Sequence, residues 1–403
     1  MTMPNEEWLQ LKNSITKELW ENIVPFWQKY GLDSTGKKII GKLSNDSIIQ
    51  SEADVSLILA TRLLWSFSAL YRARKMPEYL SFAEHIYNIL IDSFYDKDWG
   101  GFFWMIDHRG EPVDTKKKFY GQAFAIYSLV EYYFASGEAK ALEQAKQVYH
   151  LIEKHSFDPE NGGYFEAGNR DWTLAEDLRL SKVDMNEKKS MNTHLHIIEA
   201  YTNLYRAWPD PDLKKQVTAL LDIFLDYIID PDTTHFRLFF DESWNSKSEN
   251  VSFGHDIEGS WLLTETCHVL DDQPKLEKVQ EWAVKAAKVT ALESLSPDNG
   301  IYYEREGDGE MVKKYSWWVQ AEAMVGFFNA YQISKDSFFL DLTQKIWDFI
   351  MSYTRDTVHG EWFYMINNDL TPSSEEFKIC EWKGPYHNSR ACLEMINRIN
   401  QIT

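Results

Sequence analysis

Apolar and polar positions along the chain fall into pairs of helical segments. The first segment of each pair is apolar almost all round, as in residues 122–130, and this pattern predicts a buried helix. The second carries Lys, Glu and Gln along one side, as in residues 138–155, which predicts an amphipathic outer helix. Five pairs are predicted, at residues 52–74 with 77–93, 118–135 with 138–155, 188–207 with 211–229, 255–270 with 275–293, and 316–332 with 336–354.

A short pattern of glycine followed by aromatic or aliphatic residues separates the pairs. It recurs at intervals of about 60 to 72 residues. Glycine at a bend with β-forming residues after it predicts a short hairpin. The pattern begins at Gly36, Gly100, Gly162, Gly300 and Gly360, and once, weakly and without glycine, at Thr234.

The two ends of the chain supply a sixth pair. Residues 5–30 predict a lone outer helix, and residues 387–400 predict a lone inner helix. An open solenoid of tetratricopeptide repeats would have a period near 34 and no hairpin. We therefore predict an all-α fold, an (α/α)6 barrel of twelve helices with short β-hairpins between the helix pairs. The repeats fill the chain, so residues 1–403 are expected to form a single domain.

Composition narrows the function. The chain has 62 Asp and Glu against 42 Lys and Arg, a net charge of −20, which argues against nucleic acid or an anionic membrane as a partner. Three cysteines are too few and too scattered for a disulfide scaffold or a cysteine zinc site. We find no signal-peptide pattern and no apolar run long enough to span a membrane, so a cytoplasmic location is expected.

The starts of the predicted inner helices carry the candidate chemistry, because equivalent ends of these helices converge on one cavity. Arg62 lies in an apolar stretch, and a buried arginine needs a carboxylate or a ligand as its partner. The other starts carry an unusual set of polar and aromatic residues: Tyr120, Gln122, Asn192, His196, His255, Glu258, Trp317, Trp318, Gln320, Glu322, Tyr386, His387, Asn388 and Arg390.

Three histidines at matching repeat positions, His196, His255 and His387, are expected to face this cavity. A pair of imidazoles suits the transfer of a carbon-bound proton near neutral pH. Zinc is a weaker alternative, because the three come from separate repeats without a short ligand pair, so no metal is expected. A glycosidase would need two carboxylates beside the bond, and composition does not exclude one. His194 faces another way on its helix and is predicted to be structural.

Several other side chains have more than one interpretation. Glu258 could orient His255, hydrogen-bond a sugar, or form an interhelix salt bridge. Trp318 and Trp382 could be sugar platforms or core aromatics. The lysines at 116–118 are predicted to form a solvated turn.

Four segments, at residues 189–206, 252–263, 317–323 and 382–394, resemble hallmark segments of cellobiose 2-epimerases, a branch of the N-acylglucosamine 2-epimerase superfamily. The resemblance implies cofactor-independent epimerisation at C2 of a reducing-end aldose. One histidine removes the C2 proton after ring opening, and a second returns a proton on the opposite face. This would interconvert glucose and mannose configurations at the reducing end of a β-1,4-linked disaccharide.

The resemblance also implies roles for individual residues. His255 and His387 match the acid/base pair, and His196 completes the catalytic set. Arg62, Tyr120, Asn192 and Glu258 match residues that bind or support the sugar, Trp318 and Trp382 match stacking tryptophans, and Asp184 matches a residue near the ligand.

The expected partner is a small sugar, with the protein a monomer or weak homodimer. A mannose or mannobiose 2-epimerase, an aldose–ketose isomerase and a non-catalytic binding member remain alternatives, although Trp382 favours a second sugar unit.

Overall fold

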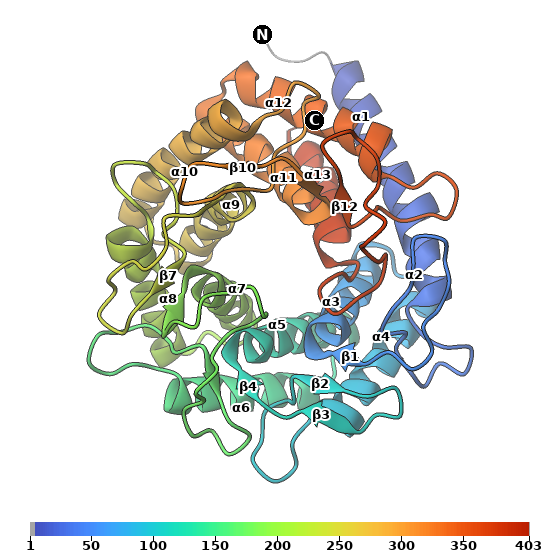
Figure 1. Ribbon diagram of the computed structural model, residues 1–403, viewed down its shortest axis with the longest axis vertical. Helices are drawn as coiled ribbons and strands as arrows, with labels where there is room; N and C mark the ends of the chain where they lie inside the picture. The colour runs from blue at the N-terminus through green and yellow to red at the C-terminus, as the bar shows by residue number, and fades with distance from the viewer. Residues whose placement is uncertain (1–4, 403) are drawn as a thin grey trace.

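A computed structural model describes residues 5–402, and its helices form a closed ring of two layers (Figure 1). The inner layer consists of α3 (Leu57–Ala73), α5 (Phe119–Ser136), α7 (Met191–Ala207), α9 (Phe253–Leu270), α11 (Trp317–Ser334) and α13 (Tyr386–Asn400). The outer layer consists of α4 (Pro77–Ile89), α6 (Ala139–His155), α8 (Pro211–Ile223), α10 (Gln273–Ser294), α12 (Ser337–Phe349) and the N-terminal run of α1 (Asn5–Glu18) and α2 (Val24–Tyr30).

The ring closes where the two ends of the chain meet. Helix α13 packs against both α11 and α3, and α1 packs against α13. The indole of Trp27 on α2 donates a hydrogen bond to Glu361 Oε2 at 2.7 Å, which ties the first outer helix to the last hairpin. The predicted (α/α)6 barrel is therefore confirmed.

The pattern of apolar residues accounts for the two layers. Helix α5 is buried along nearly its whole length, whereas α6 buries only the face that carries Ala141, Ala145, Val148 and Ile152. Four outer helices include or end in one π-helical turn, at Leu19–Ile23, Leu90–Phe94, Phe224–Ile228 and Ile350–Thr354. Burial of the apolar faces of both layers stabilises the ring.

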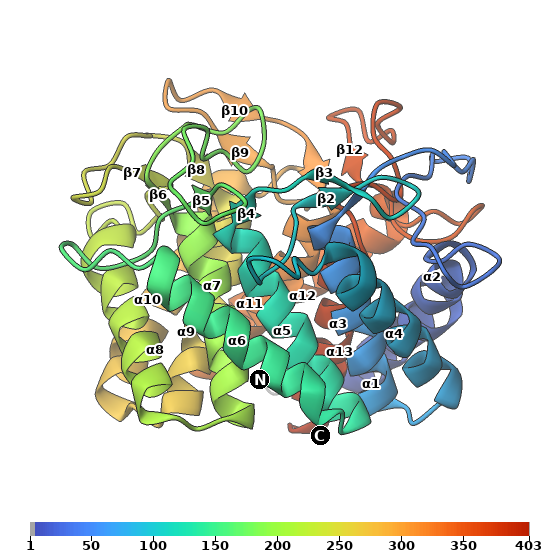
Figure 2. The ribbon, with the colours of Figure 1, turned by 90° about the horizontal axis from the view of Figure 1, so that it is seen from below.

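The predicted hairpins are present, each closed by one isolated β-bridge such as Tyr95 with Phe102 or Phe157 with Tyr164. The strands in the same loops have only two or three residues. The strands are β1 (Val55–Ser56), β2 (Met105–Ile106), β3 (Pro112–Asp114), β4 (Lys117–Lys118), β5 (Ala167–Gly168), β6 (Lys189–Ser190), β7 (Phe239–Phe240), β8 (Val251–Ser252), β9 (Glu304–Arg305), β10 (Met311–Val312), β11 (Tyr315–Ser316) and β12 (Met365–Ile366). Five inner helices begin directly after a strand, and that strand pairs antiparallel with the next hairpin along the chain. All the strands lie at one end of the ring (Figure 2), which therefore also holds the starts of these inner helices.

A buried side chain in the first turn of four inner helices holds the preceding hairpin. Gln122 accepts from the Phe102 N–H at 2.9 Å and donates to the Phe102 carbonyl at 2.8 Å. Gln320 makes the same two bonds to Ile301. His194 Nε2 accepts from the Tyr164 N–H, and Asp256 Oδ1 accepts from the Phe236 N–H. We call these four residues the hairpin anchors.

The prediction of a solvated turn at residues 116–118 is wrong for two of the three lysines. Lys117 and Lys118 are buried. Lys117 Nζ pairs with Asp96 at 3.0 Å and donates to the Gly100 carbonyl, while Lys118 Nζ donates to the Leu180 carbonyl. The charge run is therefore part of the interface between hairpins. None of the helices in residues 5–402 combines the length and apolar character needed to cross a lipid bilayer.

Candidate active site

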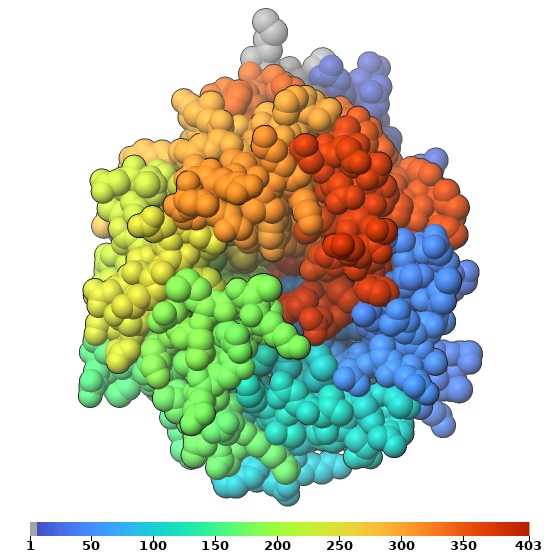
Figure 3. Space-filling model, in the orientation of Figure 1, coloured from blue at the N-terminus to red at the C-terminus, as the bar shows by residue number. Residues whose placement is uncertain are grey.

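The strand end of the ring is hollowed at its centre (Figure 3). The hollow leads to the first turns of the inner helices, where His255, Trp318 and Asn192 are only partly buried. Trp382, in the segment before α13, is partly buried as well. Helix N-termini carry partial positive charge, so this arrangement favours a ligand that develops negative charge.

The three predicted histidines are each held through Nδ1. His387 Nδ1 lies 2.7 Å from Glu322 Oε1, His196 Nδ1 lies 2.9 Å from Glu199 Oε2, and His255 Nδ1 lies 2.7 Å from Ser252 Oγ. Within residues 5–402 none of the three Nε2 atoms has a hydrogen-bond partner. An occupied Nδ1 fixes the orientation of the ring and leaves Nε2 available to a substrate.

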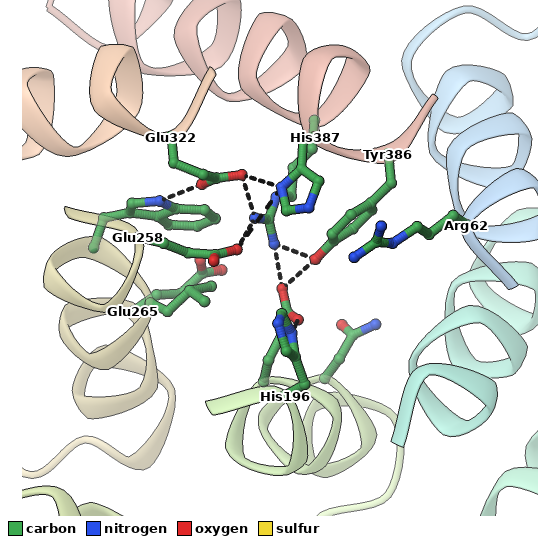
Figure 4. Close-up of polar contacts among 12 residues, drawn as sticks. Arg62, His196, Glu258, Glu265, Glu322, Tyr386 and His387 are labelled. Atoms are coloured by element: carbon green, nitrogen blue, oxygen red, sulfur yellow. Dashed lines mark hydrogen bonds and ion pairs between the residues drawn. The ribbon is translucent and has the colours of Figure 1, made fainter. Parts of the chain in front are cut away.

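Arg390 links the carboxylates behind two of these histidines. Its Nη2 lies 2.7 Å from both Glu258 Oε1 and Glu322 Oε1, and its Nη1 bonds Glu199 and the Tyr386 hydroxyl. Figure 4 shows Glu322 and His387 pointing toward each other, with Tyr386 beside them and His196 opposite. Three glutamates from α7, α9 and α11 thus converge on one guanidinium from α13.

Burial dominates the ionisation of these groups. It raises the pKa of Glu258 well above the usual value, and the neighbouring Glu322 carboxylate adds to this effect. The pKa of His387 lies well below 6.5 because of burial and the positive charges of Arg62 and Arg390. Burial also lowers the pKa of His255, to about 3. Burial therefore favours the neutral form of both imidazoles near pH 7.

Arg62 is buried, but it has no carboxylate partner among the described residues. Its Nη1 donates to the Trp382 carbonyl and its Nη2 to the Tyr120 hydroxyl at 3.1 Å. The guanidinium also lies 4.9 Å from the centre of the Phe124 ring. This charge is not neutralised by an acid, so it remains available to an anionic or polar ligand.

Aromatic rings line the central hollow beside the histidines. The Trp318 ring centre lies 4.8 Å from that of His255 and 5.6 Å from that of His387. The Trp382 ring lies 6.1 Å from Tyr120, which in turn lies 4.9 Å from His196. Such half-buried planar rings suit the apolar faces of sugars.

Polar atoms without partners mark the same place. Asn192 Oδ1, Glu258 Oε2 and Arg62 Nε are buried and make no hydrogen bond in the described structure. Buried polar groups are rarely left unpaired, because each costs about 1 to 3 kcal/mol. A ligand rich in hydroxyl groups would satisfy them.

One group of side chains in residues 5–402 has the composition of a metal site, namely Glu258, Glu322 and His387. Both glutamates already accept from Arg390 Nη2, and His387 Nδ1 is already bonded to Glu322. A protein cation thus occupies the place between the carboxylates, and we assign no metal to them.

Comparison with known proteins gives the family. A family model described as N-acylglucosamine 2-epimerase (GlcNAc 2-epimerase) matches residues 39–391. The chain belongs to this family. The cellobiose 2-epimerase of Bacteroides fragilis is 42% identical over 387 residues, which are 96% of this chain and 98% of that protein. The predicted resemblance is confirmed.

Solved structures of the family agree with this assignment. The cellobiose 2-epimerase of Bacillus thermoamylovorans B4167 has a TM-score of 0.92 at 38% identity, covering 96% of this chain and 99% of that chain. A D-mannose isomerase, 20% identical over 98% of this chain and 100% of that chain, has a TM-score of 0.82 and shares the fold.

Within this family fold, most of the predicted site residues lie together. Arg62, Tyr120, His196, His255, Glu258, His387, Trp318 and Trp382 are joined by the contacts described above. Asn192 lies one turn before His196 on α7. Asp184 lies apart in the segment before β6, where its Oδ2 accepts from the Ser181 N–H at 2.7 Å. Its charge still contributes to the raised pKa of Tyr120, of which burial is the main cause.

Of the three interpretations of Glu258, the structure shows the interhelix ion pair, which it forms with Arg390. Glu258 does not orient His255, whose Nδ1 is held by Ser252. Gln122 and Gln320 are hairpin anchors bonded to backbone rather than free cavity groups. His194 is structural as predicted, with Nδ1 bonded to the Ser190 carbonyl and Nε2 to the Tyr164 N–H.

The sequence interpretation gave no role to the groups behind the histidines. Glu199 lies three positions after His196, and this spacing on one helix face was a usable signal. Glu322 and Arg390 were noted as polar, but their contacts with His387 and Glu258 join separate helices, so local spacing could not reveal them.

A second, separate hollow lies outside the ring. This groove of about 900 Å³ runs between the end of α2, the first hairpin and α4, where Tyr30, Phe82 and His85 line it. None of the predicted site residues lines the groove, so the central hollow remains the candidate active site.

Proposed function

We propose that this protein is a 2-epimerase that interconverts the glucose and mannose configurations at the reducing end of a β-1,4-linked disaccharide such as cellobiose. The observation that carries the proposal is the pair His255 and His387, which both contact the Trp318 ring and both leave Nε2 free. The names of the full-length relatives support the choice of cellobiose.

The proposed chemistry is proton transfer at C2 of the open-chain sugar. The C2 hydrogen is acidic because it is α to the aldehyde, and one neutral imidazole takes it through Nε2 to leave an enediolate. Rotation about the C2–C3 bond then presents the other face to the second imidazole, which returns a proton to C2. His255 and His387 exchange these roles in the two directions of the reaction.

The surrounding charges support both stages. A neutral histidine is the form required of a base, and burial favours this form by lowering the pKa of both imidazoles. The proton returned to C2 must come from Nε2 of the other imidazole, so that ring carries one proton more, and for His387 the Glu322 carboxylate on Nδ1 stabilises this form. In each turnover one histidine gains a proton and the other loses one.

A positive group would stabilise the enediolate, and we assign this role to Arg62, whose guanidinium lacks a carboxylate partner. His196, beside Tyr120, would accept a hydrogen bond from a sugar hydroxyl through Nε2. Asn192 Oδ1 and Glu258 Oε2 would bind sugar hydroxyls. Trp318 is placed to stack on the reducing unit and Trp382 on the second unit, while Asp184 is assigned to the edge of the site.

The proposal includes predictions that come from the sequence. We propose a cytoplasmic location, a monomer or weak homodimer, a single domain and no cofactor. In this scheme the chain's own residues carry every proton transfer.

Product analysis tests the function. The protein is incubated in turn with cellobiose, mannobiose, glucose and mannose, and the products are identified by NMR. We expect cellobiose to give 4-O-β-glucosyl-mannose. A ketose as the main product would replace epimerisation with aldose–ketose isomerisation, and no conversion of any of the four sugars would overturn the proposal.

A further inference from the structure

His235 and Asp256 are the buried members of a cluster of charges beside the candidate active site, whose other members, Glu293 and Arg305, are partly exposed. Its Nδ1 is 2.7 Å from Asp256 Oδ2 and its Nε2 is 3.2 Å from Glu293 Oε2. Asp256 belongs to α9 and is the immediate neighbour of His255, whereas Glu293 belongs to α10 and also pairs with Arg305. The imidazole also lies near the Phe253 ring, with ring centres 5.9 Å apart.

Comparison of the repeats shows why a histidine is needed here. In three hairpins, a glycine precedes the residue whose backbone N–H bonds the anchor; these glycines are Gly101, Gly163 and Gly300. The anchors of these hairpins are the neutral Gln122, His194 and Gln320. In the fourth repeat the anchor is Asp256, a fully buried acid, and His235 replaces the glycine. A buried carboxylate requires a positive partner, which His235 supplies.

The first turn of α9 has no side-chain N-cap, as is also true of α5 and α11. Ser190 caps α7 and Ser56 caps α3, each accepting a backbone N–H through its side chain. Ser252 makes no such cap on α9, and its hydroxyl is bonded to His255 Nδ1 instead. The bonds of Asp256 to the Phe236 N–H and to His235 therefore hold the turn that carries His255.

Counting protons fixes the charge of His235. A neutral imidazole has one N–H, but here both ring nitrogens face carboxylate oxygens. Both contacts are hydrogen bonds when the ring is an imidazolium. The cluster is then balanced, with His235 and Arg305 positive and Asp256 and Glu293 negative.

We propose that His235, as an imidazolium between Asp256 and Glu293, is a positioning residue that fixes the first turn of α9 and hence the placement of His255. The effect on catalysis rests on the proposed function, whereas the effect on stability does not.

Loss of the second His235 proton should lower both the stability and the activity of the protein at alkaline pH. Although burial opposes it, the two carboxylates raise the pKa of His235 above 6.5. The stabilisation is then complete below pH 6.5, the value of the unfolded chain, and is lost as the pH rises through the higher folded value. Epimerisation should decline over the same range, because His255 loses its fixed position.

The variant Glu293→Gln tests the proposal, with Glu281→Gln as the matched control. Glu281 also lies on α10, but it pairs with the exposed Lys285. Removing Glu293 lowers the pKa of His235, so the alkaline decline of both melting temperature and kcat/KM should move to lower pH by about one unit. Glu281→Gln should leave both profiles in place. Identical profiles for all three proteins would overturn the proposal.

A second variant separates this proposal from the proposed function. His235→Gln removes the charge and keeps a hydrogen-bond donor. Its melting temperature should therefore show no alkaline decline of the kind that Glu293→Gln moves to lower pH. If the stability profiles move as expected but no sugar is converted, the charge cluster stands and the proposed function fails. If sugars are converted but neither profile moves, the function stands and the positioning role of His235 fails.

Discussion

The three active-site histidines are held in the same way but by different partners. His387 uses Glu322, His196 uses Glu199 and His255 uses the Ser252 hydroxyl. A carboxylate on Nδ1 favours the tautomer with its proton on Nδ1 and stabilises an imidazolium once Nε2 gains a proton. A hydroxyl provides less charge stabilisation, so His387 and His255 are unequal members of the catalytic pair.

The variant Glu322→Gln tests this difference at the residue scale. It keeps a hydrogen-bonding side chain but removes the charge beside His387 and Arg390, so we expect kcat to fall by about 10-fold or more with little change in KM. Steady-state kinetics with cellobiose measures both constants. Glu131→Gln, a buried glutamate elsewhere on an inner helix, is the control and should keep the wild-type kcat. A normal kcat in Glu322→Gln would contradict the assigned role.

At the scale of elements, four of the six inner helices are joined to a hairpin by an anchor. Gln122 satisfies both backbone groups of Phe102, which would otherwise be buried without partners. The anchors account for several polar side chains at the helix starts that do not take part in chemistry.

Replacing an anchor should affect stability and leave chemistry intact. Gln122→Leu leaves the Phe102 N–H and carbonyl unpaired, so we expect a loss of about 2 to 4 kcal/mol in the free energy of unfolding. Denaturant titration measures this loss, and kcat measured well below the melting temperature should stay close to wild type. A variant as stable as wild type would show that the anchor is dispensable.

Glu166 makes the start of α7 sensitive to pH. It accepts from the Ser190 N–H at 2.7 Å and from Thr193 Oγ1 at 2.6 Å, and burial raises its pKa to about 8. The stabilisation that the protonated Glu166 gives the folded protein is complete below pH 4.5, and it is lost as the pH rises through about 8. Glu166→Gln removes this titration, so its melting temperature should exceed that of wild type at pH 9 and approach it at pH 5. The exposed Glu160→Gln is the control, and equal melting temperatures of Glu166→Gln and wild type at pH 9 would refute the prediction.

The elements and the site differed in how far sequence could predict them. Helix pairs and hairpins were predictable because their signals are local periodicities and turn residues. Contacts such as Glu322 with His387 depend on how separate helices meet, and no local pattern encodes them. Lys117 was misassigned for the same reason, since its partner Asp96 lies in the preceding hairpin.

At the scale of the whole molecule, the ring is closed by contacts between the ends of the chain. Glu361 in the last hairpin is fully buried. It bonds Trp27 of α2, Asn388 of α13 and Lys383, which precedes α13. Every inner helix therefore has two inner neighbours, and no break in the ring separates one group of repeats from another.

A closed ring predicts one unfolding transition. Glu361→Ala breaks a buried charge pair and should lower the stability of the whole molecule by about 3 to 5 kcal/mol. Scanning calorimetry should show a single transition at lower temperature, whereas the exposed Glu375→Ala should melt like wild type. A separate early transition in Glu361→Ala would contradict the single domain.

His255 and His387 are proposed to exchange the C2 proton of the sugar. Deuterium at C2 of cellobiose, followed in D₂O by NMR, reports this exchange for wild type, His255→Asn and His387→Asn. Wild type should place deuterium at C2 of both epimers, and each variant should slow this exchange by about 100-fold or more while keeping the wild-type melting behaviour. Full exchange in either folded variant, or epimers formed by wild type without deuterium at C2, would contradict the account.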